Sequence, residues 1–438
     1  MNDEVAVGTR FTARMGPIIN GGLCVTQTPA GTTVLVAGGI EGEEAVVEVA
    51  YRRARTWFGH ISELLQASDE RVTPLCRYVP TCGGCQLQHI APSRQIHVKE
   101  RIVREQLERR RIRTSHLKAR LHPAADAWRY RWRGEFHVVP PAHPDGGTGL
   151  GFNRARSWTP IAVDDCLIHH SSISRSLPAL AKASAATPGL HTLHLTVGGD
   201  AGMEVLISPS PPRAADHFPV TEPPMPPPPD ITWSTSTTSL SWRGMHFRVA
   251  PESFIQVNRA MIETLYGTVL AALGDYSGKR IADAYGGIGV LGIYLAQKAA
   301  SVVCIENNPF SVQMGRLNAK LNEIDAIEFD LNPVEQSLLE QMRKAPFDVV
   351  ILDPPRAGCD TRVTAALALA GPPQVIYLSC DPATLARDLD TLTVSGPYSV
   401  ESIDIVDMFP QTYHVETVVT LRRTTPAESA DEGTGGDE

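Results

Sequence analysis

Beyond about residue 233 the sequence alternates between short apolar runs and longer amphipathic stretches, and this alternation limits the fold more than any other feature. It predicts a helix at 261–273, a strand at 280–285, a helix at 290–298 and a strand at 302–305. Helices that cross over between successive strands build a doubly wound parallel sheet. We therefore expect a Rossmann-like α/β domain in the second half of the chain.

A glycine-rich turn follows the first of these strands, and an acid ends the second. Gly287 and Gly289 lie in the turn, and Glu306 follows about twenty residues later. Backbone amides in such a turn can approach a ligand closely, and the carboxylate can accept hydrogen bonds from ribose hydroxyls. The pattern favours an adenosine-containing cofactor. The glycine spacing also fits a dinucleotide, so a nicotinamide-dependent oxidoreductase is an alternative.

Cys380 follows the apolar run 375–378, which predicts a buried strand. A thiol at the carboxyl end of such a strand faces the crevice where open α/β sheets bind ligands. We interpret Cys380 as a candidate nucleophile, with a small buried apolar cysteine as the alternative. Asp353-Pro354-Pro355 ends another apolar run, where base-methylating enzymes hold their target, and a purely structural turn is the alternative. With Asp283, this motif favours methyl transfer over hydride transfer.

Three cysteines lie within ten residues, in Cys76-x5-Cys82-Gly83-Gly84-Cys85, and Cys166 is a remote candidate for a fourth ligand. Eight cysteines are sparse for 438 residues, so this group indicates metal binding or catalysis in a reducing compartment, not a disulfide framework. Glycine-containing loops let thiolates converge on one centre. The three-plus-one spacing favours an iron–sulfur cluster, and zinc, which usually takes two close pairs, is the alternative.

The amino-terminal region looks like a nucleic-acid platform. Residues 5–63 hold short β-rich runs separated by glycine pairs, which is typical of a small OB-like barrel. Segment 51–57 places three arginines beside two aromatic rings, a combination that suits phosphate contact and base stacking. The formal net charge is -8, but basic clusters at 99–113 and 118–133 can still present a phosphate-binding face. A solvated helix face is the alternative for these clusters.

Residues 92 to about 118 predict one long charged helix. Segment 128–133 alternates aromatic residues with arginines, which predicts a strand with its arginines on one face, toward RNA. An edge strand protected by charges is the alternative. Ten prolines in 209–229 predict a stiff extended connection. The start of the chain lacks a signal-peptide pattern and no apolar stretch reaches the ~20 residues of a membrane span, so we expect a cytoplasmic protein.

Five motifs together resemble the RNA uracil-C5 methyltransferases. They are the four cysteines, Phe254-Ile255-Gln256-Val257-Asn258, Asp353-Pro354-Pro355-Arg356-Ala357-Gly358, the run from Ser379 through Cys380 to Leu389, and Phe409-Pro410-x2-Tyr413-His414-Val415-Glu416. The resemblance covers nearly the whole chain. It implies a TRAM domain at 1–63, a cluster-bearing α+β central domain at 64–232 and a class I methyltransferase domain at 233–425. The acidic residues 426–438 then form a disordered tail.

The resemblance also implies functional residues. A [4Fe-4S] cluster would be held by Cys76, Cys82, Cys85 and Cys166, with Cys380 as nucleophile and Glu416 as general base. Contacts to S-adenosylmethionine would come from Gln256, Tyr285, Glu306 and Asp353, with Asn332 or Asp330 near the adenine. Val290 departs from the small polar residue often found at its position.

The chemistry explains the need for the thiol and the acid. C5 of uracil is a weak nucleophile, so thiolate addition at C6 activates it, and a carboxylate then removes the C5 proton. The target uridine must be unstacked to reach such a pocket. We expect a monomer that forms 5-methyluridine in structured RNA. The four cysteines resemble those of the rRNA enzymes more than the compact bacterial tRNA enzymes, and this resemblance implies 23S rRNA over the tRNA T-loop. A non-catalytic RNA-binding protein on the same fold is the remote alternative.

Overall fold

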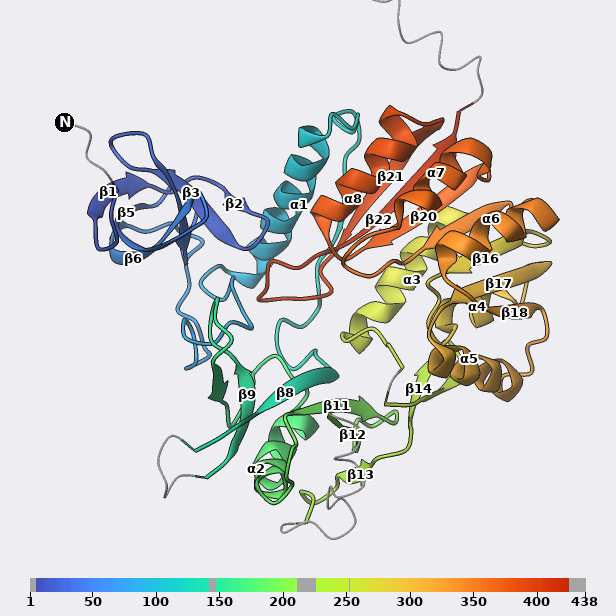
Figure 1. Ribbon diagram of the computed structural model, residues 1–438, viewed down its shortest axis with the longest axis horizontal. Helices are drawn as coiled ribbons and strands as arrows, with labels where there is room; N and C mark the ends of the chain where they lie inside the picture. The colour runs from blue at the N-terminus through green and yellow to red at the C-terminus, as the bar shows by residue number, and fades with distance from the viewer. Residues whose placement is uncertain (1–4, 142–146, 211–225, 252, 425–438) are drawn as a thin grey trace, which may run out of the picture.

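The computed structural model describes residues 5–141, 147–210, 226–251 and 253–424. Most of the proline-rich stretch and the acidic tail lie outside these ranges. Within them the chain forms an amino-terminal sheet, a central sheet and a large α/β sheet, arranged as three lobes (Figure 1). No helix in these ranges is long and apolar enough to cross a membrane.

The largest sheet has eight strands in the order β18-β17-β16-β19-β20-β22-β21-β7. Strands β16 to β20 run parallel, and β22 is antiparallel to both of its neighbours. This order confirms the predicted α/β sheet. The strands are β7 (Arg120–His122), β16 (Arg280–Ala284), β17 (Ser301–Glu306), β18 (Ile327–Leu331), β19 (Val349–Leu352), β20 (Gln374–Ser379), β21 (Tyr398–Val406) and β22 (Glu416–Arg423).

Helices cover both faces of this sheet because its central strands are buried on both sides. Ile351 packs in one cluster with helices α3 (Arg259–Leu273), α4 (Val290–Leu295) and α5 (Pro309–Leu321). Its neighbour Val350 packs in a second cluster on the other face. That cluster includes helices α1 (Pro92–Arg109), α6 (Val334–Lys344), α7 (Thr361–Ala370) and α8 (Pro382–Leu389), the last continuing into a π-helical turn at Asp390–Val394.

The amino-terminal sheet has six strands in the order β1-β5-β6-β4-β3-β2. Alternate residues of β5, including Val47 and Val49, point into its core, as the period of two requires. Helix α1 lies between this sheet and the large sheet, since Ile102 packs with the former and Leu107 with the latter (Figure 1). The strands are β1 (Arg10–Arg14), β2 (Ile18–Ile19), β3 (Leu23–Gln27), β4 (Thr33–Ala37), β5 (Glu44–Arg53) and β6 (Thr56–Gln66).

The central sheet has six strands in the order β10-β9-β8-β11-β12-β13, with helix α2 (Ser171–Ala185) packed on one face. A separate hairpin of β14 and β15 packs against the core of the large sheet. The remaining strands are β8 (Arg133–Val139), β9 (Gly149–Asn153), β10 (Pro160–Ala162), β11 (Thr192–Gly198), β12 (Glu204–Ser210), β13 (Thr232–Ser234), β14 (Thr238–Trp242) and β15 (Met245–Val249).

Two predicted elements are wrong. The helix expected to reach about residue 118 ends at Arg109, because Arg111 has φ +56° and the amide of Ile112 turns back to donate to the Leu107 carbonyl at 3.1 Å. This turn buries Ile112. The sequence has no glycine there that would predict the end of the helix.

Segment 128–133 does not form the predicted strand. Arg129 has φ +55° and its guanidinium binds Asp165 at 2.6 Å, while Arg133 donates to the carbonyls of Pro251, at 3.0 Å, and Ser253. β8 begins only at Arg133. Side-chain pairing inside the protein therefore overrides the alternating pattern.

Candidate active site

A cavity of about 550 Å³ lies at the carboxyl ends of the central parallel strands. It is where an open α/β sheet binds ligands. A smaller hollow of about 40 Å³ adjoins it and adds Asp283 to the shared lining residues. The larger cavity brings together seven residues singled out in the sequence: Gln256, Tyr285, Gly287, Glu306, Asp353, Cys380 and Glu416.

Two of the predicted cofactor residues are not in either lining. Gly289 caps α4 with φ +77°, and a Cβ there would meet the ring of Phe329 at 2.8 Å, so this glycine serves the turn. Asn332 is exposed and donates to Asp330 at 2.6 Å. Asp330 itself also accepts from Ser337 and Gln341, which draws its carboxylate toward α6. The adenine contact assigned to either residue stays a prediction.

The glycine turn and Glu306 are held together. The amide of Gly287, which has φ +57°, donates to one carboxylate oxygen of Glu306 at 3.0 Å, and the amide of Asn308 donates to the other at 2.8 Å. Tyr285 also has a positive φ, of +64°, an uncommon conformation for a residue with a large side chain. The turn therefore presents backbone and acid to the same side of the cavity.

Three carboxyl groups are buried around this site. Burial raises the pKa of Asp353 to about 7, with help from Asp283, and raises that of Asp283 to about 6. Burial, and next the charge of Asp353, also holds the pKa of Glu416 well above its usual range. One oxygen of Asp283 has no hydrogen-bond partner among the described residues. Such a group of acids favours a cationic ligand, because a nearby positive charge stabilises carboxylates.

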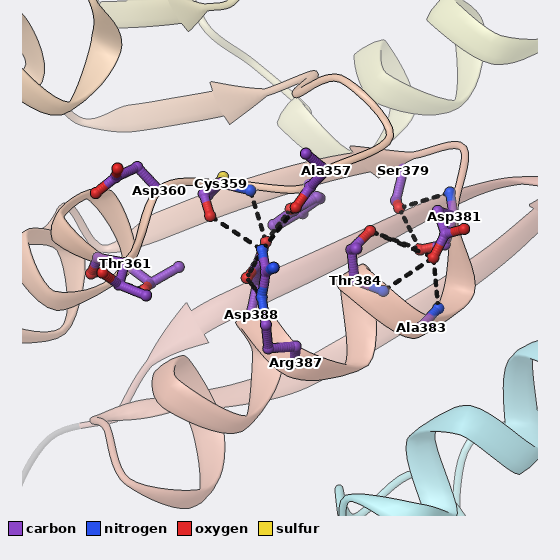
Figure 2. A network of polar contacts seen from close by, with 12 residues as sticks. Ala357, Cys359, Asp360, Thr361, Ser379, Asp381, Ala383, Thr384, Arg387 and Asp388 are labelled. Atoms are coloured by element: carbon purple, nitrogen blue, oxygen red, sulfur yellow. Dashed lines mark hydrogen bonds and ion pairs between the residues drawn. The ribbon is translucent and has the colours of Figure 1, made fainter. Parts of the chain in front are cut away.

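Cys380 lies between β20 and α8. Its neighbour Asp381 caps the helix by accepting from the amides of Ala383 and Thr384 at 2.9 and 3.0 Å (Figure 2). The side chain of Ser379 donates to the Asp381 carbonyl at 3.0 Å. Because Asp381 already occupies the free amides of the helix, these amides do not stabilise a thiolate at Cys380.

The charge around the thiol comes from side chains instead. Burial and the charges of Glu416 and Asp353 together raise the pKa of Cys380 to about 12, whereas Arg356 lowers it. Arg356 also lowers the pKa of Glu416. It lines the cavity and is therefore the cation that favours the thiolate.

The loop after β19 carries Arg356 and is fixed by α8 (Figure 2). Arg387 donates to the carbonyl of Cys359 at 3.0 Å, and Asp388 accepts from the amide of Cys359 at 2.8 Å. The hydroxyl of Thr384 donates to the Arg356 carbonyl at 3.2 Å. One helix thus sets the position of both the thiol and the cation.

The segment that precedes Glu416 in the sequence is held in place by residues of the amino-terminal half of the chain. Gln95 of α1 donates to the side chain of Gln411 at 3.0 Å and accepts from its amide at 2.7 Å. The hydroxyl of Tyr130 donates to the Pro410 carbonyl at 2.9 Å. These contacts fix the approach to β22, whose first residue is Glu416.

The sequence arguments gave no role to three other lining residues: Arg356, His414 and Phe254. Arg356 and His414 lie 3.5 Å apart, and burial lowers the pKa of His414 to about 3, so its imidazole is neutral at physiological pH. Phe254 is 61% exposed although it is a large apolar residue. All three belong to the sequence motifs described above, and their place in those motifs could have identified them as candidate site residues.

The four motif cysteines line a second cavity, of about 210 Å³, and none of them forms a disulfide. Apolar groups such as Phe152 and Val163 share its wall, and Nδ1 of His169 lies 3.1 Å from Sγ of Cys166. In the described part of the chain no group of three or more His, Cys, Asp or Glu side chains is arranged to hold a metal ion. The thiols therefore share a cavity without the geometry of a single-ion site.

Comparison with known proteins identifies the family. Residues 232–424 match the model of the tRNA (uracil-5-)-methyltransferases. An RNA methyltransferase of Gloeobacter violaceus is 30% identical over 95% of this chain and 97% of its own. The 23S rRNA (uracil(1939)-C(5))-methyltransferase RlmD of Thiobacillus denitrificans is 30% identical over 90% of this chain and 95% of its own.

A solved structure shows the same fold. The Pyrococcus abyssi tRNA (uracil-54, C5)-methyltransferase, in complex with S-adenosyl-L-homocysteine, aligns with a TM-score of 0.68 and 24% identity, over 93% of this chain and 99% of that chain. The matched segment contains the cavity with its thiol, its acids and its glycine turn. The protein therefore belongs to the S-adenosylmethionine-dependent RNA (uracil-C5)-methyltransferase family.

Proposed function

We propose that this enzyme forms 5-methyluridine in 23S rRNA, with Cys380 as nucleophile and Glu416 as general base. One observation carries the proposal: a thiol and a buried acid line the same cavity as the glycine turn and Glu306. The Thiobacillus denitrificans relative, named for 23S rRNA, supports this substrate. The tRNA T-loop is the second candidate, favoured by the fold shared with the Pyrococcus abyssi enzyme.

The cavity fits S-adenosylmethionine. Gln256, Tyr285, Glu306 and Asp353 would hold it, and its sulfonium would supply both the methyl group and a positive charge. The fit rests on the buried acids, since the raised pKa of Asp353 and the unpartnered oxygen of Asp283 indicate a site that lacks a cation.

Cys380 would begin the reaction by forming a bond from its sulfur to C6 of the uracil. The π electrons of the C5–C6 bond then move onto C5 and the carbonyl at C4, which makes C5 nucleophilic. Arg356 favours the thiolate that this step needs. Phe254, exposed at the cavity, offers a ring against which the unstacked base can lie.

Glu416 would complete the reaction. Once C5 carries the methyl group, its remaining hydrogen must leave as a proton so that the C5–C6 double bond re-forms and the thiolate departs. Burial holds the pKa of Glu416 well above its usual range, which makes its carboxylate a stronger base than an exposed one. Arg356 lowers the pKa of Glu416 and so favours its carboxylate form.

The four cysteines would hold a [4Fe-4S] cluster. A zinc ion with Zn–S bonds of about 2.3 Å brings its sulfurs within about 3.8 Å of one another, whereas a cluster holds its ligands farther apart. Four thiols that line one cavity of about 210 Å³ support the proposal of one shared centre. Anaerobic purification should yield iron and acid-labile sulfide in equal amounts, and Cys82→Ser should lose both. Bound zinc without sulfide would contradict the proposal.

Residues 1–63, which hold most of the amino-terminal sheet, would act as a TRAM, OB-like RNA-binding domain, and 64–232 as the cluster-bearing domain. The β5–β6 hairpin supports this role: Arg52 lies 5.1 Å from the ring of Trp57, and Arg53 and Arg55 are exposed. Replacing the three arginines with Gln should make the slope of log Kd against log salt concentration shallower, by the equivalent of about two to three phosphate contacts. The exposed Arg343→Gln is the matched control and should leave that dependence unchanged.

The substrate is tested by mapping 5-methyluridine in rRNA and tRNA from cells with and without the gene, followed by rescue. Loss at one 23S site, restored by the wild type and not by Cys380→Ala, is the expected result. Loss in the T-loop would move the assignment to tRNA. If 5-methyluridine stays unchanged in both pools, the proposed function fails.

A further inference from the structure

A groove separate from the active site runs along the central sheet. It has a volume of about 700 Å³ and lies on the face that α2 does not cover, where Glu135 and His137 of β8 point outward. The loop after β9 forms one wall. Its lining includes Glu135, His137, Arg154, Arg156, Trp158 and His191.

Trp158 is the strongest feature of this groove. Its side chain is 92% exposed, the highest value among the large apolar residues of the described chain. The loop that carries it is nevertheless well built: Arg154 donates its amide to the Thr159 carbonyl at 2.9 Å, and the amide of Ala155 donates to the carbonyl of Thr81 at 2.8 Å. A fixed loop that holds an indole in water presents a flat apolar surface to a partner.

The charges beside this ring point to one kind of partner. Arg154 and Arg156 are exposed, and among the described residues neither guanidinium has a hydrogen-bond or ion-pair partner. Glu135, on the opposite wall, can accept from the N–H groups of a base. Cations, a flat ring and an acceptor together match the phosphate, the face and the edge of a nucleotide.

The groove lies next to the cysteine cavity, which in turn adjoins the Cys380 cavity. Gly84 lines both the groove and the cysteine cavity, and Arg131 lines both the cysteine cavity and the cavity that contains Cys380. The amide of Gly83 donates to the Asn153 carbonyl at 3.0 Å, so the cysteine loop and the Trp158 loop are joined. The groove therefore lies one cavity away from the active site, so that nucleotides flanking the target can reach it over the protein surface while the cysteine cavity holds its own centre.

We infer that this groove binds an unpaired nucleotide of the substrate RNA, with its base stacked on Trp158 and its phosphates on Arg154 and Arg156. The inference rests on the proposed function, because the occupant is the same RNA that carries the target uridine. The groove shares no lining residue with the Cys380 cavity, so it contributes to affinity and RNA selection and leaves the chemical step to the active site.

The test compares Trp158→Ala, Trp158→Phe and the control Leu369→Ala, whose leucine is 80% exposed on α7. The probes are unmodified 23S rRNA and total tRNA from cells that lack the gene. Trp158→Ala should raise Kd for the methylated RNA about 5- to 150-fold, the range for loss of one stacked base. Trp158→Phe should recover most of the affinity, and Leu369→Ala should match the wild type.

Further readouts separate binding from misfolding and from failure of the proposed function. Trp158→Ala should keep wild-type affinity for S-adenosylmethionine and wild-type kcat at saturating RNA. The double variant Arg154→Gln with Arg156→Gln should have a shallower slope of log Kd against log salt concentration, by the equivalent of about one to two phosphate contacts. A Kd for Trp158→Ala within twofold of wild type on both probes overturns the inference, whatever the substrate is. Absence of methylation of either RNA by the wild type overturns the proposed function instead.

Discussion

Nζ of Lys99 donates to a carboxylate oxygen of Asp407 at 2.5 Å, and the Lys99 side chain has no exposed surface. The same ammonium donates to the Phe409 carbonyl at 2.9 Å. This pair joins α1 to the segment that leads to Glu416. It links two parts of the chain that are 308 residues apart.

Removing one partner of this pair should be costly. Lys99→Met leaves Asp407 buried without its cation, and loss of one partner of a buried pair costs about 3–5 kcal/mol in the free energy of unfolding. Lys344→Met is the control, because Lys344 forms an exposed pair with Glu340 at 2.9 Å. Urea denaturation of both variants measures the difference. An equal loss in the free energy of unfolding for the two variants would show that the buried pair stabilises the fold no more than the exposed pair does.

Cys380→Ala and Glu416→Gln should fail at different steps. Without the thiol no bond to uracil forms, so Cys380→Ala should give neither product nor a covalent complex. Glu416→Gln keeps the nucleophile and loses the base, so turnover should fall about 10²- to 10⁴-fold while a covalent protein–RNA complex accumulates. A denaturing gel with labelled RNA distinguishes them. A complex formed by Cys380→Ala would exclude Cys380 as the nucleophile.

Arg356→Gln should make the thiol harder to ionise. The Arg356 cation lowers the pKa of Cys380, which burial and the nearby acids together raise to about 12, so its removal raises that pKa further. Alkylation of Cys380 by iodoacetamide, followed by peptide mass spectrometry, should therefore be slower in the variant at every pH from 7 to 9. The exposed Arg343→Gln serves as control. An unchanged alkylation rate at Cys380 would show that the Arg356 guanidinium does not promote ionisation of the thiol.

The buried acids predict a pH dependence of stability without cofactor. The pKa of Asp353 is raised from 3.8 to about 7, so the folded protein binds more protons than the unfolded chain between these values. The free energy of unfolding should therefore fall as the pH rises through this window. Asp353→Asn should reduce the fall, on the order of 2–4 kcal/mol, and the exposed Asp325→Asn should not. Denaturation at pH 5 and pH 8 measures it, and a wild-type stability that rises over this window would contradict the raised pKa.

The sequence predicted the parallel sheet and most of the cavity because strand periodicity and the glycine turn are local signals. Cys380, Asp353 and Glu306 each follow an apolar run, and the carboxyl ends of parallel strands meet at one edge. The end of α1 and the conformation at Arg129 could not be read in the same way. Each depends on distant partners, such as Asp165 for Arg129, that leave no periodic trace.

The edge strand β7 is made long before the strand it pairs with. Arg120 donates to Asp404 of β21 at 2.7 Å, across 284 residues of sequence. A ribosome that adds 5–20 residues per second needs roughly 15–60 s to make that interval. Throughout this time β7 and the apolar side of α1 have no large sheet to join. The large sheet therefore gains its edge strand, and closes as one α/β unit, only after β21 and β22 leave the exit tunnel.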